Sequence, residues 1–246
     1  MRLGHDDGWC IPPDAPFYPA LPAVYRGVQF HLLFFQAAPP AVGDCLPEPL
    51  EPDTEGSCVV GAIDIPFCGN YGPFQEVFFG LKCTFRGQSG YYTSHVFHNG
   101  PAGIAAGREI YGTPKIYSTI TMKRVDRSMC SEASVGGVPV LRLSTTSEQV
   151  VPSSTMPLLT PAWRLKVIPR ADGPGPALKQ LIDCSNSTKD LVIHFFARGK
   201  GTMALTSSPL IDLSRLQPVG YGDAFYMECD YSEHYAEIAY DYLHPK

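Results

Sequence analysis

Short runs of alternating apolar and polar residues make up most of the chain. In the segment KIYSTITMKRV, every second residue from Ile116 to Met122 falls on one face of an extended strand. The 24 prolines and 23 glycines interrupt such runs at short intervals, which is typical of strands joined by turns. The runs richest in β-branched and aromatic residues are the predicted strands: residues 24–36, 58–67, 76–85, 91–97, 116–125, 138–144, 163–168, 191–197, 202–206, 224–229 and 235–240.

Only three segments show the features of a helix. NGPAGIAAGREI is predicted to begin with Asn99 as N-cap and Pro101 in the first turn. GPALKQLIDC, residues 175–184, is a second predicted helix, and PPAVGDCLP, residues 39–47, contains a short third. No Gly/Ser linker or internal repeat divides the sequence. We therefore expect one mainly antiparallel β domain over residues 1–246, a barrel or a sandwich, with a few helices.

Composition narrows the classes of partner. Hydrophobic residues form 44% of the chain, enough for a sizeable core, while charged residues form only 17%. The net charge is −5 and the lysines and arginines are scattered, so no nucleic-acid partner is predicted. The low charge and the 11% of aromatic residues favour apolar surface buried in a homo-oligomer, although a large core alone explains them too.

The sequence gives no sign of a membrane partner. No apolar run reaches the length of a membrane span, and the first residues lack the apolar core of a signal peptide. The expected location is therefore cytoplasmic. The eight cysteines show no C-x-x-C pair and no regular spacing, which indicates reduced, mostly buried thiols.

Several apparent motifs have weak support. His95 and His98 lie three residues apart, and on a strand such residues point to opposite faces, so a buried or solvated role is favoured over a metal site. GQSG lacks the serine position of a nucleophile elbow, and the glycines around Lys200 lack the spacing of a phosphate loop. We expect no metal and no dinucleotide cofactor.

Lys115 is the strongest candidate for a chemically reactive residue. It lies between Pro114 and Ile116, an apolar setting that is unusual for a lysine. Burial in an apolar pocket, or a cation such as Arg108 nearby, lowers the pKa of a lysine and frees the amine to attack a ketone or aldehyde. The product is an iminium that withdraws electrons from the adjacent carbon. On local chemistry alone, an ordinary surface lysine in a β-turn is at least as good an interpretation.

The wider sequence resembles a known family. GREIYGTPKI resembles the Schiff-base lysine motif of the acetoacetate decarboxylase family, and YGPFQEVFFGLKCTFRG is similar to its strand with an active-site glutamate. PAVYRGVQFHLLFFQAAPPAVGDCLPEPLEPD, WRLKVIPRADGPGPALKQLID and LTSSPLIDLSRLQPV…AEIAYDYL resemble other parts of the family in the same order. The resemblance runs from about Tyr18 to Leu243, which leaves residues 1–17 as an N-terminal extension.

The resemblance implies both a fold and a chemistry. The family fold is a mostly antiparallel, cone-shaped β-barrel with a few flanking helices around a deep pocket. Its enzymes need no cofactor, because a lysine forms the Schiff base. By this resemblance Lys115 is the Schiff-base lysine, with Glu76, Arg108 and Arg26 as further catalytic residues and Glu109 as the partner of Arg108 beside the substrate.

One position departs from the family pattern. Acetoacetate decarboxylases carry a second lysine after the Schiff-base lysine, and the family is the standard example of a lysine activated by a neighbouring cation. Here Ile116 occupies that position, so the substrate need not be acetoacetate. The aromatic residues Phe78, Phe79, Tyr92, Phe97 and Tyr111 are expected to suit a larger substrate, as in secondary metabolism. The predicted substrate-binding set is Glu109, Tyr111, Phe97, Tyr92, Phe78 and Ile116.

Two classes of function follow from the resemblance. The first is a lyase that acts through an iminium on a keto acid or another small carbonyl compound, with decarboxylation of a β-keto acid as the leading reaction. Aldolase, dehydratase or cyclase activity on a larger carbonyl substrate uses the same iminium and is the alternative. The second class is a barrel that binds a small molecule without catalysis.

Overall fold

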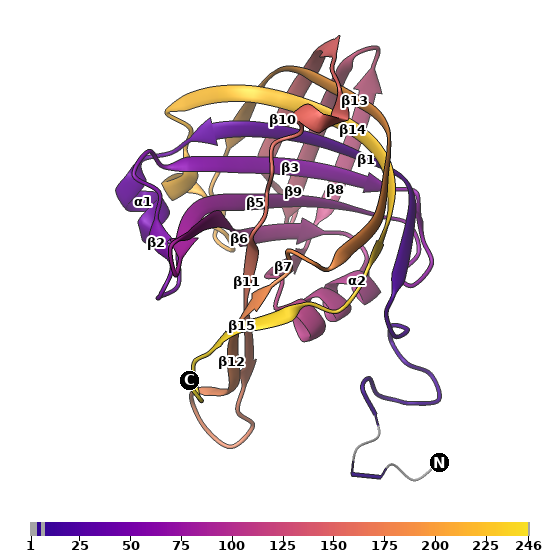
Figure 1. Cartoon of the computed structure of the whole chain (residues 1–246), viewed down its shortest axis with the longest axis vertical. Helices are drawn as coiled ribbons and strands as arrows, with labels where there is room; N and C mark the ends of the chain where they lie inside the picture. Colours follow the sequence, from indigo (N-terminus) through magenta and orange to yellow (C-terminus); the bar gives the residue numbers. More distant parts are fainter. Residues whose placement is uncertain (1–3, 6–7, 246) are drawn as a thin grey trace.

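One strongly curved β-sheet forms most of the structure, a computed structural model that describes residues 4–5 and 8–245 (Figure 1). Its fifteen strands in the described part of the chain are β1 (Ala23–Gln36), β2 (Glu51–Pro52), β3 (Ser57–Ile65), β4 (Phe67–Cys68), β5 (Phe74–Phe85), β6 (Gln88–His98), β7 (Lys115–Tyr117), β8 (Thr119–Val125), β9 (Ser128–Val135), β10 (Val138–Val150), β11 (Ala162–Pro169), β12 (Pro176–Asp183), β13 (Thr188–Leu205), β14 (Gly220–Glu233) and β15 (Glu237–Asp241). The helical segments are α1 (Pro39–Gly43), α2 (Pro101–Ala106), the π-helix η1 (Gly107–Tyr111), and the 3₁₀ turns η2 (Ser153–Thr155) and η3 (Ser214–Leu216).

The strand order confirms the predicted mainly β class, but it shows that the predicted barrel is not closed. Along its main path the sheet runs β15-β12-β11-β6-β5-β3-β1-β14-β13-β10-β9-β8. Among the described strands, β6 pairs in parallel with β11 and with β7, and the other pairs are antiparallel. The path ends at β15 and β8 without a pair between them, so the sheet curves like a barrel but does not close.

The predicted helix over residues 175–184 is wrong. This segment forms β12, which pairs with β11 on one side and β15 on the other. Its Ala, Leu, Lys and Gln residues favour helix weakly in isolation, and two rows of strand pairing override that preference. Leu181 is fully buried in the resulting sheet.

The other predicted helices are present with altered ends. α1 lies inside the predicted residues 39–47. α2 begins after Gly100, because the Asn99 side chain instead accepts a hydrogen bond from the backbone N–H of Gln75. The predicted strand over 116–125 is divided at Ser118, whose backbone N–H donates to the carbonyl of His98. β7 therefore aligns with β6, while β8 turns away to pair with β9.

The strands β1, β3 and β5 have two buried faces. One face packs against β8, β9, β10, α1 and η3 in a continuous apolar core that includes Leu33, Val60, Phe79, Leu141 and Leu216. Figure 1 shows β1, β3, β5 and β6 as a layer with β8 and β9 behind it. The opposite face carries a second apolar cluster, and the cavity described below lies on that face.

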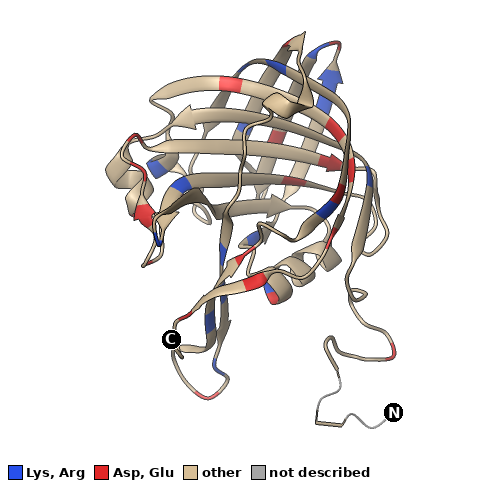
Figure 2. Cartoon of the chain, in the orientation of Figure 1, with Lys and Arg blue, Asp and Glu red and all other residues tan. Residues whose placement is uncertain are grey.

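The cysteine and charge predictions agree with the structure. All eight cysteines are free thiols; six are buried, Cys45 is half-buried and Cys130 is exposed. In Figure 2 red and blue residues are dispersed over most of the ribbon, and several blue residues lie along the arm formed by β11 and β12. Among the described residues, no helix is long and apolar enough to cross a membrane.

Candidate active site

Because side chains alternate along β5, neighbouring residues lie in different environments. Val77 and Phe79 are fully buried in the packed core. Glu76, Phe78 and Gly80 point the other way and line a cavity of about 320 Å³. The walls come from β1, β3, β5, β6, β11 and β14, with α2, η1 and β7 at one end. This volume lies in the range of small-molecule sites.

The chain reaches Lys115 through a tight turn. Gly112 has φ of +71°, and a Cβ there would lie 2.3 Å from the Cα of Lys166 on β11, so both its conformation and its neighbour require glycine. The backbone N–H of Thr113 donates to the carbonyl of Gly107 at 2.9 Å and closes the end of η1. β7 then pairs in parallel with β6, with Lys115 in register with Val96. Both residues line the cavity.

Lys115 and Glu76 form a close ion pair inside the cavity. The Nζ atom of Lys115 lies 2.9 Å from Oε2 of Glu76, and the two side chains are only 12% and 15% exposed. The ammonium also lies 5.7 Å from the centre of the Phe74 ring. The amine and the carboxylate therefore meet on an apolar surface with limited access to water.

His98 lies behind this pair. It faces Glu76 across the β5–β6 register, and its Nε2 atom lies 3.9 Å from Oε2 of Glu76. Its Nδ1 atom accepts a hydrogen bond of 2.8 Å from the backbone N–H of Gly100, so the neutral ring carries its proton on Nε2. Burial, reinforced by the Lys115 ammonium, lowers the pKa of His98 to about 3. A neutral ring thus directs an N–H toward Glu76.

The charges around Glu76 keep it ionised. Burial raises the pKa of this carboxyl group, but the Lys115 ammonium, His98 and the Arg164 guanidinium outweigh burial, and the pKa lies below its ordinary value. Glu76 is therefore an anion at neutral pH.

Two glycines allow the helical segment to approach these side chains. A Cβ at Gly103 would lie 2.8 Å from the His98 ring, and a Cβ at Gly107 would lie 2.7 Å from Cε of Lys115. The two positions are one turn apart on α2 and η1. A helix without side chains on this face packs directly against the lysine and the histidine.

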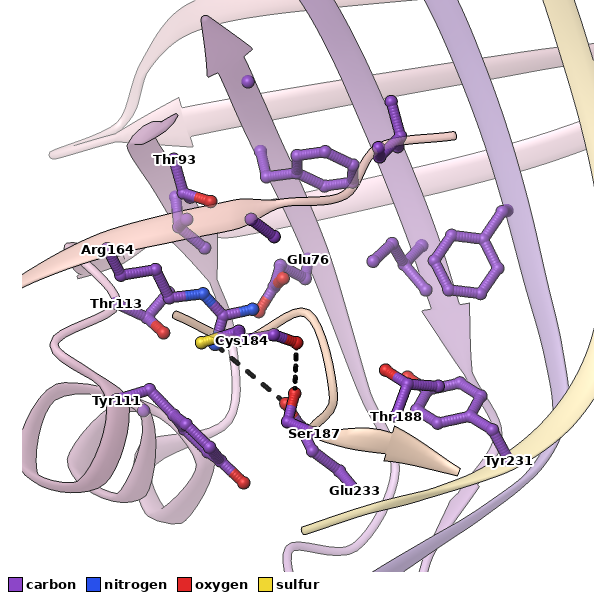
Figure 3. Close-up of a pocket in the computed structure, with 18 of the residues that line it drawn as sticks. Glu76, Thr93, Tyr111, Thr113, Arg164, Cys184, Ser187, Thr188, Tyr231 and Glu233 are labelled. Carbon is purple, nitrogen blue, oxygen red and sulfur yellow. Dashed lines mark hydrogen bonds and ion pairs between the residues drawn. The ribbon is translucent and has the colours of Figure 1, made fainter. Parts of the chain in front are cut away.

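A second charged centre lies on β11. Arg164 has a largely buried side chain, stacked at 5.4 Å over the Tyr111 ring, with Nη1 4.0 Å from Oε1 of Glu233. Its Nε atom is buried without a hydrogen-bond partner. Figure 3 shows the guanidinium directed toward the carboxylate of Glu76, with Cys184 beside it. Burial opposes the charge of Arg164, but Cys184 and Glu233 lead the groups that raise its pKa, so it remains a cation.

Tyrosines complete the polar end of the cavity. The hydroxyl of Tyr25 donates to Glu233 at 3.2 Å, and the Tyr25 ring stacks on Tyr231 at 4.6 Å. The Tyr111 hydroxyl donates to the carbonyl of His234 at 2.8 Å. Burial raises the pKa of all three phenols, so each is neutral. They are hydrogen-bond donors and not bases at neutral pH.

The predicted site residues fall into two groups. Lys115, Glu76, Tyr111 and Phe78 line the cavity. The others are not among its lining residues: Arg26, Arg108, Glu109, Phe97, Tyr92 and Ile116.

The three predicted residues with exposed charges lie around the cavity and not in it. The Arg26 side chain is 51% exposed and faces Asp230 at 3.9 Å. The Arg108 guanidinium donates to the backbone carbonyl of Lys115 at 3.2 Å and so supports the turn, and Glu109 accepts a hydrogen bond from Tyr18. Both contacts link the Arg-Glu pair to the surroundings of the lysine.

The three remaining residues lie on other faces because strand residues alternate. Phe97 belongs to the packed core, opposite Val77. Tyr92 packs in a separate apolar cluster with Trp163. Ile116 is in register with Phe97 on β7, so its side chain leaves the strand on the face opposite to Lys115.

The comparisons with known proteins agree with this geometry. The family model described as Acetoacetate decarboxylase (ADC) matches residues 11–243. The chain belongs to the acetoacetate decarboxylase family. Acetoacetate decarboxylase 2 of Mesorhizobium japonicum is 26% identical over 241 residues, which cover 96% of this chain and 90% of that protein. Acetoacetate decarboxylase 1 of Bradyrhizobium diazoefficiens is 26% identical over 243 residues, with 96% and 94% covered.

Solved structures of acetoacetate decarboxylases share the fold. The enzyme from Legionella pneumophila superimposes with a TM-score of 0.87 at 20% identity, over 99% of this chain and 100% of that one. The enduracididine biosynthesis enzyme MppR, complexed with the condensation product of pyruvate and imidazole 4-carboxaldehyde, gives 0.81 at 17% identity, over 97% and 98%. Enzymes of the acetoacetate decarboxylase family use a lysine Schiff base without a metal cofactor. Among the described residues, no group of three or more metal-ligating side chains occurs.

The sequence analysis did not identify Arg164, Glu233 or His98 as site residues. Arg164 lies between Trp163 and Leu165, the same apolar setting that drew attention to Lys115, so a comparable signal was present. The signals for the other two were weaker. His98 becomes informative only once its register with Glu76 is known, and Glu233 lies in an acidic segment that suggests solvated charge.

Proposed function

We propose that the protein is a cofactor-independent lyase that forms a Schiff base between Lys115 and a keto acid, with decarboxylation of a β-keto acid as the leading reaction. The observation that carries the proposal is the 2.9 Å contact between Lys115 and Glu76, whose side chains are largely buried in the cavity. Family membership supports the same chemistry. Arg108 supports the lysine through its carbonyl contact.

The chemistry follows from this ion pair. A lysine attacks a carbonyl carbon only as the neutral amine, and Glu76 is the nearest base to accept the proton. The carbinolamine loses water to give the iminium. In a β-keto acid, the electron pair of the bond to the carboxylate then moves toward the iminium nitrogen, releases CO₂ and leaves an enamine. Protonation of the enamine carbon and hydrolysis return the ketone and the free amine.

A second reaction on the same iminium is favoured by the second charged centre. The enamine that decarboxylation produces also forms by loss of a proton, and it can then attack an aldehyde in an aldol condensation. Arg164, Glu233 and the Tyr25 hydroxyl supply a cation, a base and a donor for such a step. MppR, whose fold this chain shares, has been observed with pyruvate and with a condensation product.

Borohydride reduction in the presence of a keto acid tests the proposal. Reduction should add the mass of the reduced adduct to the peptide that contains Lys115, and Lys115→Ala should lose both adduct and turnover while the fold persists. Lys166 is the sharpest rival, because burial lowers its pKa although Glu109 opposes the shift, and it does not line the cavity. Adduct at Lys166 or Lys200 would contradict the assignment, and Lys166→Ala is the matched control.

Two further measurements separate the remaining alternatives. Turnover should survive EDTA without added cofactor, and recovery of lost turnover by zinc would contradict the proposal. A protein that binds a keto acid but gives neither adduct nor product would be a binding barrel. We also propose that the protein is a homo-oligomer, that it is located in the cytoplasm and that it acts in secondary metabolism. Sedimentation tests the first point, cell fractionation the second and the substrate profile the third.

A further inference from the structure

Arg164 is a largely buried cation in the cavity, and among the described residues its ion-pair partner is the distant carboxylate of Glu233. Its contact with Glu233 spans 4.0 Å, beyond hydrogen-bond length, and its Nε atom is buried with no partner. A buried guanidinium donor that is left unpaired is costly to the folded protein. Protein atoms cover Nε, but the Nη atoms reach the cavity, and a carboxylate there can accept charge-assisted hydrogen bonds from them.

The surroundings fix the orientation of this group. The guanidinium stacks on the Tyr111 ring, and Figure 3 shows it directed toward Glu76, the residue that contacts Lys115. Because the ring supports one flat side of the guanidinium, its edge remains for a planar acceptor. A molecule with its carbonyl carbon at Lys115 can therefore bring a carboxylate to Arg164.

The opposite part of the cavity is apolar. Phe30 on β1, Val59 and Ile63 on β3, Phe78 on β5 and Met227 on β14 line it. β3, β1 and β14 follow β5 in the sheet, on the side away from β11 and Arg164. All five side chains pack in one cluster, and a Cβ at Gly61 would lie 2.3 Å from the Phe78 ring, so this wall is close-packed.

We propose that Arg164 binds the carboxylate of the substrate and that the apolar wall binds a substituent larger than a methyl group. The substrate class is then a keto acid with a charged end at β11 and an aliphatic or aryl tail toward β1, β3 and β14. The inference rests on the proposed function for the carbonyl at Lys115 but concerns a different residue. Arg26, the arginine that the family resemblance suggests, is outside the cavity and does not supply this contact.

Binding of unreactive analogues tests the inference separately from Schiff-base chemistry. A hydroxy acid has no ketone or aldehyde group for Lys115 to convert to an iminium, so calorimetry with 3-hydroxyoctanoate and its neutral amide reports recognition alone. The unmodified protein should bind the acid about 10- to 100-fold more tightly than the amide, as expected for a charge-assisted hydrogen bond. Arg164→Met should remove that preference, Arg164→Lys should restore part of it, and Arg142→Met, at an exposed arginine that pairs with Glu132 outside the cavity, should leave it unchanged.

Chain length tests the apolar wall. Each buried methylene contributes about 0.8 kcal/mol, or about four-fold in affinity. 3-Hydroxyoctanoate should therefore bind at least ten-fold more tightly than 3-hydroxybutanoate. Equal affinity for the two acids would overturn the tail assignment.

The carboxylate assignment has its own contrary outcomes. Equal affinity of the unmodified protein for the acid and the amide would overturn it, even if Arg164→Met failed to fold. Equal weakening of both ligands by Arg164→Met would show a structural role for the arginine. The absence of a borohydride adduct at Lys115, together with a retained acid preference, would contradict the proposed function and leave the carboxylate site standing.

Discussion

The two faces of β1, β3, β5 and β6 differ in whether their buried polar groups have hydrogen-bond partners. On the packed face, His31 is fully buried and both ring nitrogens are bonded, to Thr145 at 3.0 Å and to Ser131 at 2.6 Å. On the cavity face, His98 is just as buried, but its Nε2 atom has no hydrogen-bond partner and faces Glu76 at 3.9 Å. The fold satisfies its own polar groups on one face and leaves donors unpaired on the other.

This difference distinguishes residues that stabilise the fold from residues that a ligand or a reaction can use. A buried donor without a partner costs free energy, and proteins retain such groups where a ligand or a reaction uses them. On the cavity face the unpaired atoms are Nε2 of His98, Nε of Arg164, Oγ1 of Thr113 and the Tyr71 hydroxyl, which are all the atoms of this kind in the described part of the chain. The packed face has none, so its residues should respond to mutation through stability alone.

Glu76 and Val77 are adjacent residues on the two faces and give the largest expected contrast. Glu76→Gln keeps the shape but removes the base, and should lower kcat about 10²- to 10⁴-fold with the fold intact. Val77→Ala should leave kcat nearly unchanged and lower the free energy of unfolding by about 1–3 kcal/mol, because it opens a space in the core. Steady-state kinetics and urea unfolding of both variants measure this. Loss of kcat in Val77→Ala without loss of stability would refute the separation.

The two buried histidines make stability depend on pH. Burial lowers the pKa of His31 to about 4, and burial with the Lys115 ammonium lowers that of His98 to about 3. In the unfolded chain both titrate near 6.5. Below pH 6.5 the unfolded chain therefore binds protons that the folded chain does not, and the free energy of unfolding should fall by a few kcal/mol between pH 6.5 and about 4.

Urea unfolding at several pH values measures this slope. His31→Gln and His98→Gln should each reduce it. Between pH 6.5 and 5 the slope of the unfolding free energy reports the histidines and not Glu76. The pKa of Glu76 is lowered, so its contribution to stability is lost only at lower pH. An unchanged slope after both substitutions would contradict the assignment.

Gly107 tests the contact between η1 and the lysine. Gly107→Ala places a methyl group 2.7 Å from Cε of Lys115, so the lysine side chain or the helix must shift, which disturbs the contact between Lys115 and Glu76. We expect kcat to fall about 10- to 100-fold, since displacements near 1 Å misalign reacting groups. Gly173→Ala, in open space, is the control. Kinetics and thermal unfolding of the two variants compare them, and equal kcat values would exclude the close contact.

The sequence predicted the β class and singled out Lys115, which lines the cavity, but it did not single out Arg164 or Glu233. Strand alternation and turn residues are local, so the β class and α1 followed from them, and GREIYGTPKI located Lys115. The same alternation assigns Phe78 and Phe79 to different faces once Glu76 is placed. Arg164 has an apolar sequence setting like that of Lys115, but its place in the cavity depends on the parallel pairing of β11 with Tyr91 and Tyr92 of β6, a contact between distant segments. Residues 175–184 were misassigned for the same reason.

Ile116 should give the smallest effect, although it is the clearest departure from the family pattern. Its side chain leaves β7 on the face opposite to Lys115, in register with Phe97, and it does not line the cavity. A lysine there can extend its ammonium toward solvent, because position 116 is only partly buried. We therefore expect Ile116→Lys to change kcat/KM less than about three-fold and to cost about 1 kcal/mol of stability through lost apolar burial. Acetoacetate turnover by Ile116→Lys and by the apolar control Ile116→Val measures this directly. A gain above ten-fold for the lysine variant alone would mean that the new charge acts on Lys115 across the strand, and that the two faces of β7 are electrostatically coupled.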